Sequence, residues 1–308
     1  GLPRIRRLAG CTQPRGRCVM GAELRIGTCS WRFPSWEGLV YSAPKSINYL
    51  QEYAEQYDTV EIDRWFWSLF GEDSIGLPNP SDVWAYRDAV PDDFVFTVKA
   101  PNSITLTHFY HKKKSDPLIE NPYFLSSALF RRFLSLLDPL GGTLGPVMLQ
   151  FGYLNKQMVD SQADFQQRLA PFVAEIPETY EYGLEVRNAR YLNRSFFEFL
   201  IEHRLRPVLL QGYWMPSIDG IYADWGDLIA EHDTVVIRLL GPDRKGIEKK
   251  TGKTWDRVVA PKDEELSAIV KMTEDLVRRG VTVYLNVNNH YEGSAPRTIE
   301  RIRALLTI

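Results

Sequence analysis

The chain has 308 residues and a formal charge of −2, because 37 lysines and arginines nearly balance 39 aspartates and glutamates. Hydrophobic residues make up 44% and charged residues 25%, which excludes a disordered chain, a collagen and a disulfide-stapled mini-protein. No apolar run approaches the roughly 18 residues of a membrane span. The length suits two ordinary domains or one barrel of about 250 residues with additions.

The charge is unevenly distributed along the chain. Residues 1–19 contain no acidic residue and five arginines, namely Arg4, Arg6, Arg7, Arg15 and Arg17. The formal −2 becomes −7 for residues 20–308 once those five positive charges are set aside. Because the segment lacks apolar periodicity, we expect residues 1–22 to form a loosely ordered basic extension and residues 23–308 to form one folded domain.

Three cysteines, Cys11, Cys18 and Cys29, show no paired spacing. An odd count of this kind predicts neither a disulfide framework nor a zinc knuckle, and it indicates a reducing compartment. We therefore expect a cytoplasmic protein without membrane contact.

Short β-rich segments alternate with segments of helical spacing from residue 24 onward. The expected strands are Leu24–Ser30, Thr59–Ile62, Phe94–Ala100, Pro146–Phe151, Tyr182–Arg187, Arg206–Gln211, Thr234–Leu240 and Val281–Asn288. Apolar residues at helical spacing lie between them, at 49–57, 129–137, 165–173, 196–201, 266–277 and 299–306, with weaker patterns near 83–87 and 228–229. Eight strand–helix units predict a (β/α)8 TIM barrel as a single domain with a short N-terminal extension.

A doubly wound sheet is the alternative fold, but no G-x-G-x-x-G follows the first strand, so no nucleotide cofactor motif is present. In the barrel, two long strand-to-helix connections, 101–124 and 241–261, should lie on the catalytic face.

Polar residues inside the predicted strands are the main chemical signal. Strand residues alternate between the helices and the barrel interior, and the helix-facing positions are apolar. The inward positions are Glu61, Asp63, Lys99, Gln150, Glu185, Arg187, Arg238, Asn286 and Asn288. Because buried charges need partners, they form either a purely stabilising ion-pair network or a pocket for a polar ligand, which we prefer.

The residue types suggest roles in such a pocket. Three cations, Lys99, Arg187 and Arg238, indicate an anionic substrate, and the two arginines suit bidentate binding of phosphate or carboxylate. We expect proton transfer by Glu61, Glu185, Lys99 and His108. Substrate contacts are expected from Gln150, Asp63, Asn288 and Asn289 in addition to the arginines, the two asparagines orienting substrate or stabilising an oxyanion.

A divalent metal is an open alternative. His108 and His290 follow the third and eighth strands, and a zinc or manganese site could combine them with Glu61, Asp63 or Glu185. The three nearby cations count against a site with several metal ions. The alternative role of each histidine is hydrogen bonding within its loop.

Aromatic and basic residues follow the same strands. Trp31 comes after the first strand and Trp67 after the second, where they either stack on bases or sugars or pack the loops. Basic residues concentrate at 112–114 and 244–257. Together these features are typical of a phosphate site or a nucleic-acid groove, although loop lysines are commonly just solvated.

A series of segments resembles the YecE-like family, a widespread TIM-barrel domain of unknown function. The segments are Ile26–Trp31, Thr59–Asp63, Phe96–Ala100, Ile104–His108, Leu144–Phe151, Leu184–Arg187, Arg238–Gly241, Asn288–Asn289 and Gly293–Ala295. The resemblance runs from about residue 24 to the C-terminus and implies a TIM barrel. It places Glu61, Lys99, His108, Gln150, Glu185, Arg187, Arg238, Asn288 and Asn289 at family motif positions.

The chain departs from the family pattern at several positions. It has Cys29-Ser30 where Ser-Gly is usual, and Asp63 where Asn is usual. It also has Arg238–Gly241 as Arg-Leu-Leu-Gly, where an aromatic residue and a histidine commonly precede the glycine.

Three functional hypotheses follow. The first is a hydrolase or lyase acting on an anionic, phosphorylated substrate at the C-terminal face of the barrel. The second is a nucleic-acid-binding or metal-dependent phosphodiester-cleaving protein. The third is a non-catalytic binding barrel or a sugar-handling enzyme that uses paired carboxylates. The sugar-handling hypothesis is weakened because inward cations could neutralise Glu61 and Glu185.

Overall fold

The computed structural model of the chain describes residues 21–71, 74–110 and 116–308. The first twenty residues of the predicted basic extension, with Cys11 and Cys18, lie outside the described residues, as do the lysines at 112–114. Among the described residues, no helix combines the length and hydropathy that crossing a membrane requires.

Eight parallel strands close into one barrel, in the order β1-β10-β9-β8-β7-β6-β5-β2. Their bounds are β1 (Leu24–Cys29), β2 (Thr59–Ile62), β5 (Val95–Lys99), β6 (Leu144–Phe151), β7 (Tyr182–Val186), β8 (Arg206–Gly212), β9 (Thr234–Gly241) and β10 (Thr282–Val287). The helices are α1 (Tyr49–Gln56), α2 (Pro80–Asp88), α3 (Asn102–Thr105), α4 (Ser127–Leu137), α5 (Gln162–Glu175), α6 (Arg194–Glu202), α7 (Ile218–Ile229), α8 (Arg244–Thr251), α9 (Asp263–Arg278) and α10 (Ala295–Leu305). The predicted (β/α)8 TIM barrel is confirmed.

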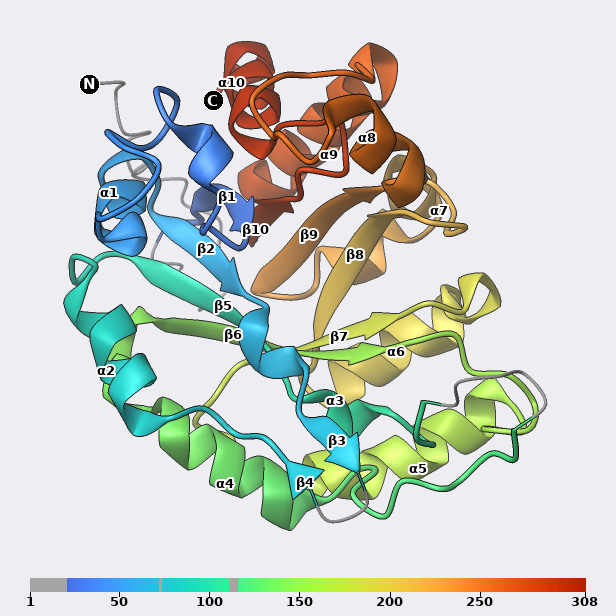
Figure 1. Cartoon of the computed structure of the whole chain (residues 1–308). Helices are drawn as coiled ribbons and strands as arrows, with labels where there is room; N and C mark the ends of the chain where they lie inside the picture. The colour runs from blue at the N-terminus through green and yellow to red at the C-terminus, as the bar shows by residue number, and fades with distance from the viewer. Residues whose placement is uncertain (1–20, 72–73, 111–115) are drawn as a thin grey trace. The chain divides into compact units, whose positions relative to one another are not determined.

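The described chain divides into two compact units, one formed by residues 21–60 with 207–308 and the other by residues 61–206. In the first unit, β8, β9, β10 and β1 lie side by side, as Figure 1 shows. In the second, β5, β6 and β7 form a parallel set in the same way (Figure 1).

The strands are buried on both faces. Every residue of β2, β7 and β9 is buried, including the charged residues Glu61, Glu185 and Arg238. Parallel barrel strands are covered by helices outside and by packed side chains inside, so their helix-facing positions are apolar and their polar residues turn inward.

Short polar residues begin several helices, as capping requires. Ser126 accepts a hydrogen bond from the Leu129 amide at the start of α4, and Asn193 accepts one from the Phe196 amide at the start of α6. In α4, four apolar side chains at helical spacing are buried, Phe130, Phe133, Leu134 and Leu137.

The connection after β9 contains a helix that we did not predict. We expected one long strand-to-helix connection from residue 241 to about 261, but α8 occupies Arg244–Thr251. Asp243 caps it by accepting from the Gly246 amide at 2.8 Å, and Gly252 ends it with a φ of +60°. Of its residues only Ile247 and Thr251 are buried, so α8 has almost no apolar periodicity to detect.

Two further short elements follow β2 and β5. The strands β3 (Leu69–Gly71) and β4 (Ser74–Ile75) form an antiparallel pair after the 3-10 turn at Arg64–Phe66. The single turn α3 lies directly after β5. Both belong to the unit of residues 61–206.

Candidate functional site

The predicted site residues are divided between the two units. The unit of residues 61–206 contains Glu61, Asp63, Trp67, Lys99, His108, Gln150, Glu185 and Arg187, and the other unit contains Trp31, Arg238, Asn288 and Asn289.

Buried polar side chains lie along β2, β5, β6 and β7. Glu61 is completely buried in β2, and Lys99 is the last residue of β5. Gln150 in β6 and Glu185 in β7 are partners in the strand register, and both are buried. The polar residues that we predicted to point into the barrel are thus buried in the strands. An unpaired charge in such surroundings would destabilise the fold.

Glu185 and Arg187 form an ion pair at the end of β7. The Arg187 Nε donates to Glu185 Oε1 at 3.0 Å, and the glutamate side chain is only 1% exposed, against 25% for the arginine. A buried carboxylate that accepts a charge-assisted hydrogen bond fixes the plane of the guanidinium. Arg187 is therefore held in place from the barrel side.

Lys99 packs against an aromatic ring. Its Nζ lies 3.7 Å from the centroid of the Phe66 ring, which belongs to the 3-10 turn after β2. Attraction between an ammonium group and a ring face is worth roughly 0.5–2 kcal/mol, depending on exposure. The contact ties the end of β5 to the connection that follows β2.

Asp63, Trp67 and His108 lie in the connections that follow the strands. The Asp63 carbonyl accepts from the Phe66 amide at 3.1 Å and begins the turn that carries the exposed Trp67. The Nδ1 of His108 lies 2.9 Å from Thr107 Oγ1, and His108 forms an isolated β-bridge with Glu120. His108 thus has the loop hydrogen bond that was its alternative role.

In the other unit, Arg238 lies buried in the middle of β9. Its register partner in β10 is Asn286, which is also buried. Trp31 follows β1 with a buried side chain, and its carbonyl accepts a hydrogen bond from the Tyr41 hydroxyl. Arg238 and Trp31 are thus interior residues of this unit.

Asn288 and Asn289 both bond to their own loop. Asn288 Oδ1 accepts from the His290 amide at 2.9 Å and lies 2.6 Å from Nδ1 of the same histidine. Asn289 Oδ1 accepts from the amide of Ala295 at 2.9 Å, at the first residue of α10. These contacts hold the connection after β10, and substrate binding by the two amides stays a prediction.

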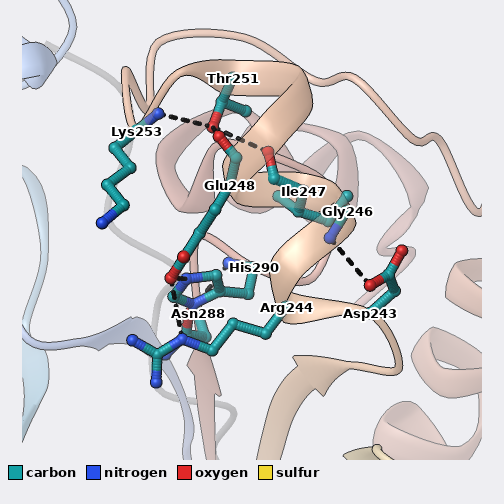
Figure 2. A network of polar contacts seen from close by, with 9 residues as sticks. All are labelled: Asp243, Arg244, Gly246, Ile247, Glu248, Thr251, Lys253, Asn288 and His290. Atoms are coloured by element: carbon teal, nitrogen blue, oxygen red, sulfur yellow. Dashed lines mark hydrogen bonds and ion pairs between the residues drawn. The ribbon is translucent and has the colours of Figure 1, made fainter.

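A polar network that we did not predict links α8 to this connection, as Figure 2 shows. Glu248 Oε1 lies 3.1 Å from His290 Nε2 and accepts from Arg244 Nε at 2.9 Å (Figure 2). The ring of His290 also meets Trp255 edge to face, with centroids 4.9 Å apart. Asn288 Oδ1 already accepts a backbone N–H, which identifies it as the amide oxygen, so a proton on His290 Nδ1 fits the 2.6 Å contact, and Nε2 donates to Glu248 when the ring is protonated.

The surroundings of this network shift two pKa values. Burial lowers the pKa of His290, the charges of Arg244 and Lys253 lower it further, and Glu248 opposes them. Hydrogen bonds from Arg244 and His290 lower the pKa of Glu248. Nothing in the sequence pointed to this pairing, because Glu248 lies within a basic run and has no periodic relation to His290.

Metal ligands do not gather in the described part of the chain. Within residues 21–71, 74–110 and 116–308, no three His, Cys, Asp or Glu side chains come together as a metal site requires. The zinc or manganese alternative stays a prediction from the sequence.

Fold and site together define a (β/α)8 barrel protein with buried ionic groups in its strands and an arginine fixed at a strand end. Over residues 25–308 the sequence matches the family described as Protein of unknown function DUF72. The chain belongs to that family, and the resemblance to the YecE-like family is confirmed.

Individual relatives agree with this assignment. UPF0759 protein YecE of Escherichia coli strain K12 is 27% identical over 174 residues, which are 55% of this chain and 50% of that protein. The same figures hold for UPF0759 protein YecE of E. coli O157:H7, so the chain spans about half the length of the curated relatives it matches.

Two solved structures share the fold. A DUF72 family protein from Thermotoga maritima MSB8 has a TM-score of 0.64 at 22% identity, covering 93% of this chain and 100% of its own. A DUF72 family protein from Enterococcus faecalis V583 has a TM-score of 0.63 at 17% identity, covering 92% and 96%. These likenesses show the fold and no reaction.

Proposed function

We propose that the protein is a hydrolase or lyase that acts on an anionic, phosphorylated substrate at the ends of β5 and β7. The observation that carries this proposal is the ion pair of Glu185 and Arg187. A partly exposed guanidinium fixed by a buried carboxylate suits bidentate binding of phosphate. Because the side chain is already oriented, little conformational entropy is lost when the ligand binds.

Each residue of the unit has a proposed role. Arg187 binds the phosphate and Glu185 acts through it as a positioning residue. Lys99, held against Phe66, supplies a second positive charge. Glu61, Lys99 and His108 are the groups proposed for proton transfer, and Gln150 for hydrogen bonding to the substrate.

Substitution of Arg187 tests the phosphate site. We expect Arg187→Ala to weaken binding of inorganic phosphate by about tenfold or more in isothermal titration calorimetry, because charge-assisted hydrogen bonds contribute about 1.5–3 kcal/mol. Arg190→Ala is the matched control, since Arg190 is an exposed arginine in the next turn (Ala189–Tyr191). Equal phosphate affinity in the wild type and Arg187→Ala would overturn the proposal.

Turnover needs its own measurement. Incubation with a panel of phosphomonoesters, with chromatography of the products, detects hydrolysis as released phosphate and elimination as an unsaturated product. Product formation should fall in Glu61→Gln and Lys99→Met, with the folded state checked by circular dichroism. If the wild type binds phosphate and yields no product with any ester, the protein is a binding barrel.

A nucleic-acid ligand is the second candidate, and one observation favours it. The residues in and after α8 carry exposed positive side chains, including Lys245, Lys249, Lys250 and Lys253. Such a basic patch is typical of contact with a phosphate backbone. Its binding should depend on salt far more steeply than the binding of a small phosphorylated substrate.

A further inference from the structure

Two large aromatic side chains are exposed in the unit of residues 61–206, close to each other. Trp67 is 61% exposed and Tyr110 is 62% exposed, and their ring centroids lie 6.1 Å apart. They come from different connections, one after β2 and one after β5. Exposed aromatic rings from two segments that meet in this way form a surface typical of ligand contact.

A buried hydrogen-bond cluster holds the two segments. Asn102 Oδ1 accepts from the Ser68 amide at 2.9 Å, the Ser68 hydroxyl at 3.0 Å and the Leu69 amide at 3.0 Å. A hydrogen bond from the same side chain lowers the pKa of the Tyr110 hydroxyl. Because Asn102 is buried at the start of α3, it fixes the segment of Ser68 and Leu69 to the end of β5. The rings are therefore presented by a built support.

Both cations of the proposed site belong to the same unit as this aromatic pair, and Lys99 is linked to Trp67 through Phe66. The Phe66 ring contacts Lys99 on one side and meets the Trp67 ring nearly edge-on, with centroids 5.1 Å apart. Burial raises the pKa of the Tyr110 hydroxyl, and the charge of Arg187 lowers it. A contact series thus runs from Lys99 through Phe66 and Trp67 to Tyr110.

We propose that the substrate of this site is a phosphomonoester that carries an aromatic ring, and that Trp67 and Tyr110 stack on that ring. The inference rests on the proposed function, since it takes Arg187 as the residue that holds the phosphate. In this arrangement the phosphate is held by Arg187, and the group esterified to it packs against Tyr110 and Trp67. Ring stacking favours a flat aromatic group over an alkyl group.

Two ligands of equal charge test this proposal. Phenyl phosphate and ethyl phosphate are both monoesters, and only the first carries a ring. We expect phenyl phosphate to bind about tenfold more tightly in calorimetry, since stacking of one ring on an aromatic side chain contributes about 1–3 kcal/mol. Trp67→Ala and Tyr110→Ala should each reduce that preference. Both side chains are exposed, so these variants are expected to fold.

Controls separate this inference from the proposed function. Trp84→Ala removes another exposed tryptophan, located on α2, and should leave the preference unchanged. Arg187→Ala should weaken both ligands equally. Equal affinity of the wild type for the two esters would overturn the aromatic substrate while leaving the phosphate site intact. No binding of either ester would overturn both proposals, and a preference that survives Trp67→Ala and Tyr110→Ala would overturn the assigned surface.

Discussion

Ser30, directly after β1, adopts a backbone conformation that suits glycine. Its φ is +86°, outside the region that L residues adopt without strain, and the YecE-like family usually has glycine at this position. The Ser30 carbonyl is fixed there because it accepts from the Thr28 hydroxyl at 2.6 Å. Residues in such sparsely populated conformations cost about 1–3 kcal/mol.

We predict that Ser30→Gly stabilises the protein by about 1 kcal/mol, because relief of strain exceeds the extra freedom that glycine gives the unfolded chain. Urea denaturation followed by circular dichroism measures the change. Ser46→Gly is the control: Ser46 has a φ of +63°, within the left-handed region, so a smaller change is expected. A destabilised Ser30→Gly variant would show that the serine side chain stabilises the fold by more than its strained backbone conformation destabilises it.

His290 titrates between charges of both signs, so its pKa should respond in opposite directions to two substitutions. Glu248 raises the pKa of His290 and Lys253 lowers it. We predict that Glu248→Gln lowers the pKa further and Lys253→Gln raises it. NMR titration of the His290 ring protons measures both shifts. Lys249→Gln, next to Glu248 on α8, is the control and should leave the pKa of His290 unchanged. Shifts of the same sign in both variants would contradict the network of Figure 2.

The same pKa has a consequence for stability against pH. Burial places the pKa of His290 below its value of about 6.5 in the unfolded chain. The unfolded chain therefore binds more protons below that pH, and the contribution of His290 to stability decreases as the pH falls from about 6.5 towards the folded pKa. Glu248 limits this loss because it opposes the lowering, so Glu248→Gln should make the decrease steeper.

At the scale of elements, the strands were predictable and several connections were not. The alternation of apolar and polar residues predicted that Lys99 and Glu185 belong to barrel strands, because the helix-facing side of every strand must be apolar. The hydrogen bonds that Asn102 accepts from Ser68 and Leu69 have no counterpart in the sequence pattern. They join residues far apart in the chain, and no periodicity relates these positions. Helix α8 was not predicted because it buries almost no apolar side chain. Its contact with the rest of the unit includes the polar pair of Glu248 and His290.

The ends of β9 and β10 approach each other so closely that one position requires glycine. Gly241 has a φ of +78°, and a Cβ there would lie 2.6 Å from the carbonyl oxygen of His290. Backbone atoms cannot yield as a flexible side chain would. Gly241 thus sets the distance between the end of β9 and the residue that contacts α8.

We predict that Gly241→Ala destabilises the protein by about 3 kcal/mol, because backbone strain and a steric clash combine. Gly252→Ala is the matched control, since Gly252 has a φ of +60° with open space around its Cβ position, and about 1 kcal/mol is expected there. Urea denaturation measures both. Equal losses would show that the approach to His290 relaxes without cost.

At the scale of the whole molecule, the charge distribution bears on which anion the protein binds. The total of −2 combines five arginines within residues 1–19 with a formal −7 over residues 20–308. A polyanion approaching residues 20–308 meets net repulsion, so its binding has to draw on many local lysines and arginines. A small phosphate ester needs only the few positive charges of one site. The net negative charge of residues 20–308 repels such a small anion only weakly.

Salt therefore distinguishes the two ligand classes. We predict that affinity for phenyl phosphate falls by less than about tenfold between 50 and 200 mM KCl, since few ion contacts form. A nucleic acid held by six to ten phosphate contacts would lose about 10³–10⁵ in affinity over the same range. Calorimetry with phenyl phosphate and fluorescence anisotropy with a labelled oligonucleotide give the two slopes. Tight oligonucleotide binding with the steep slope, weakened by replacing Lys249 and Lys250 with glutamine and unaffected by Arg187→Ala, would favour the nucleic-acid function over the small phosphate ester.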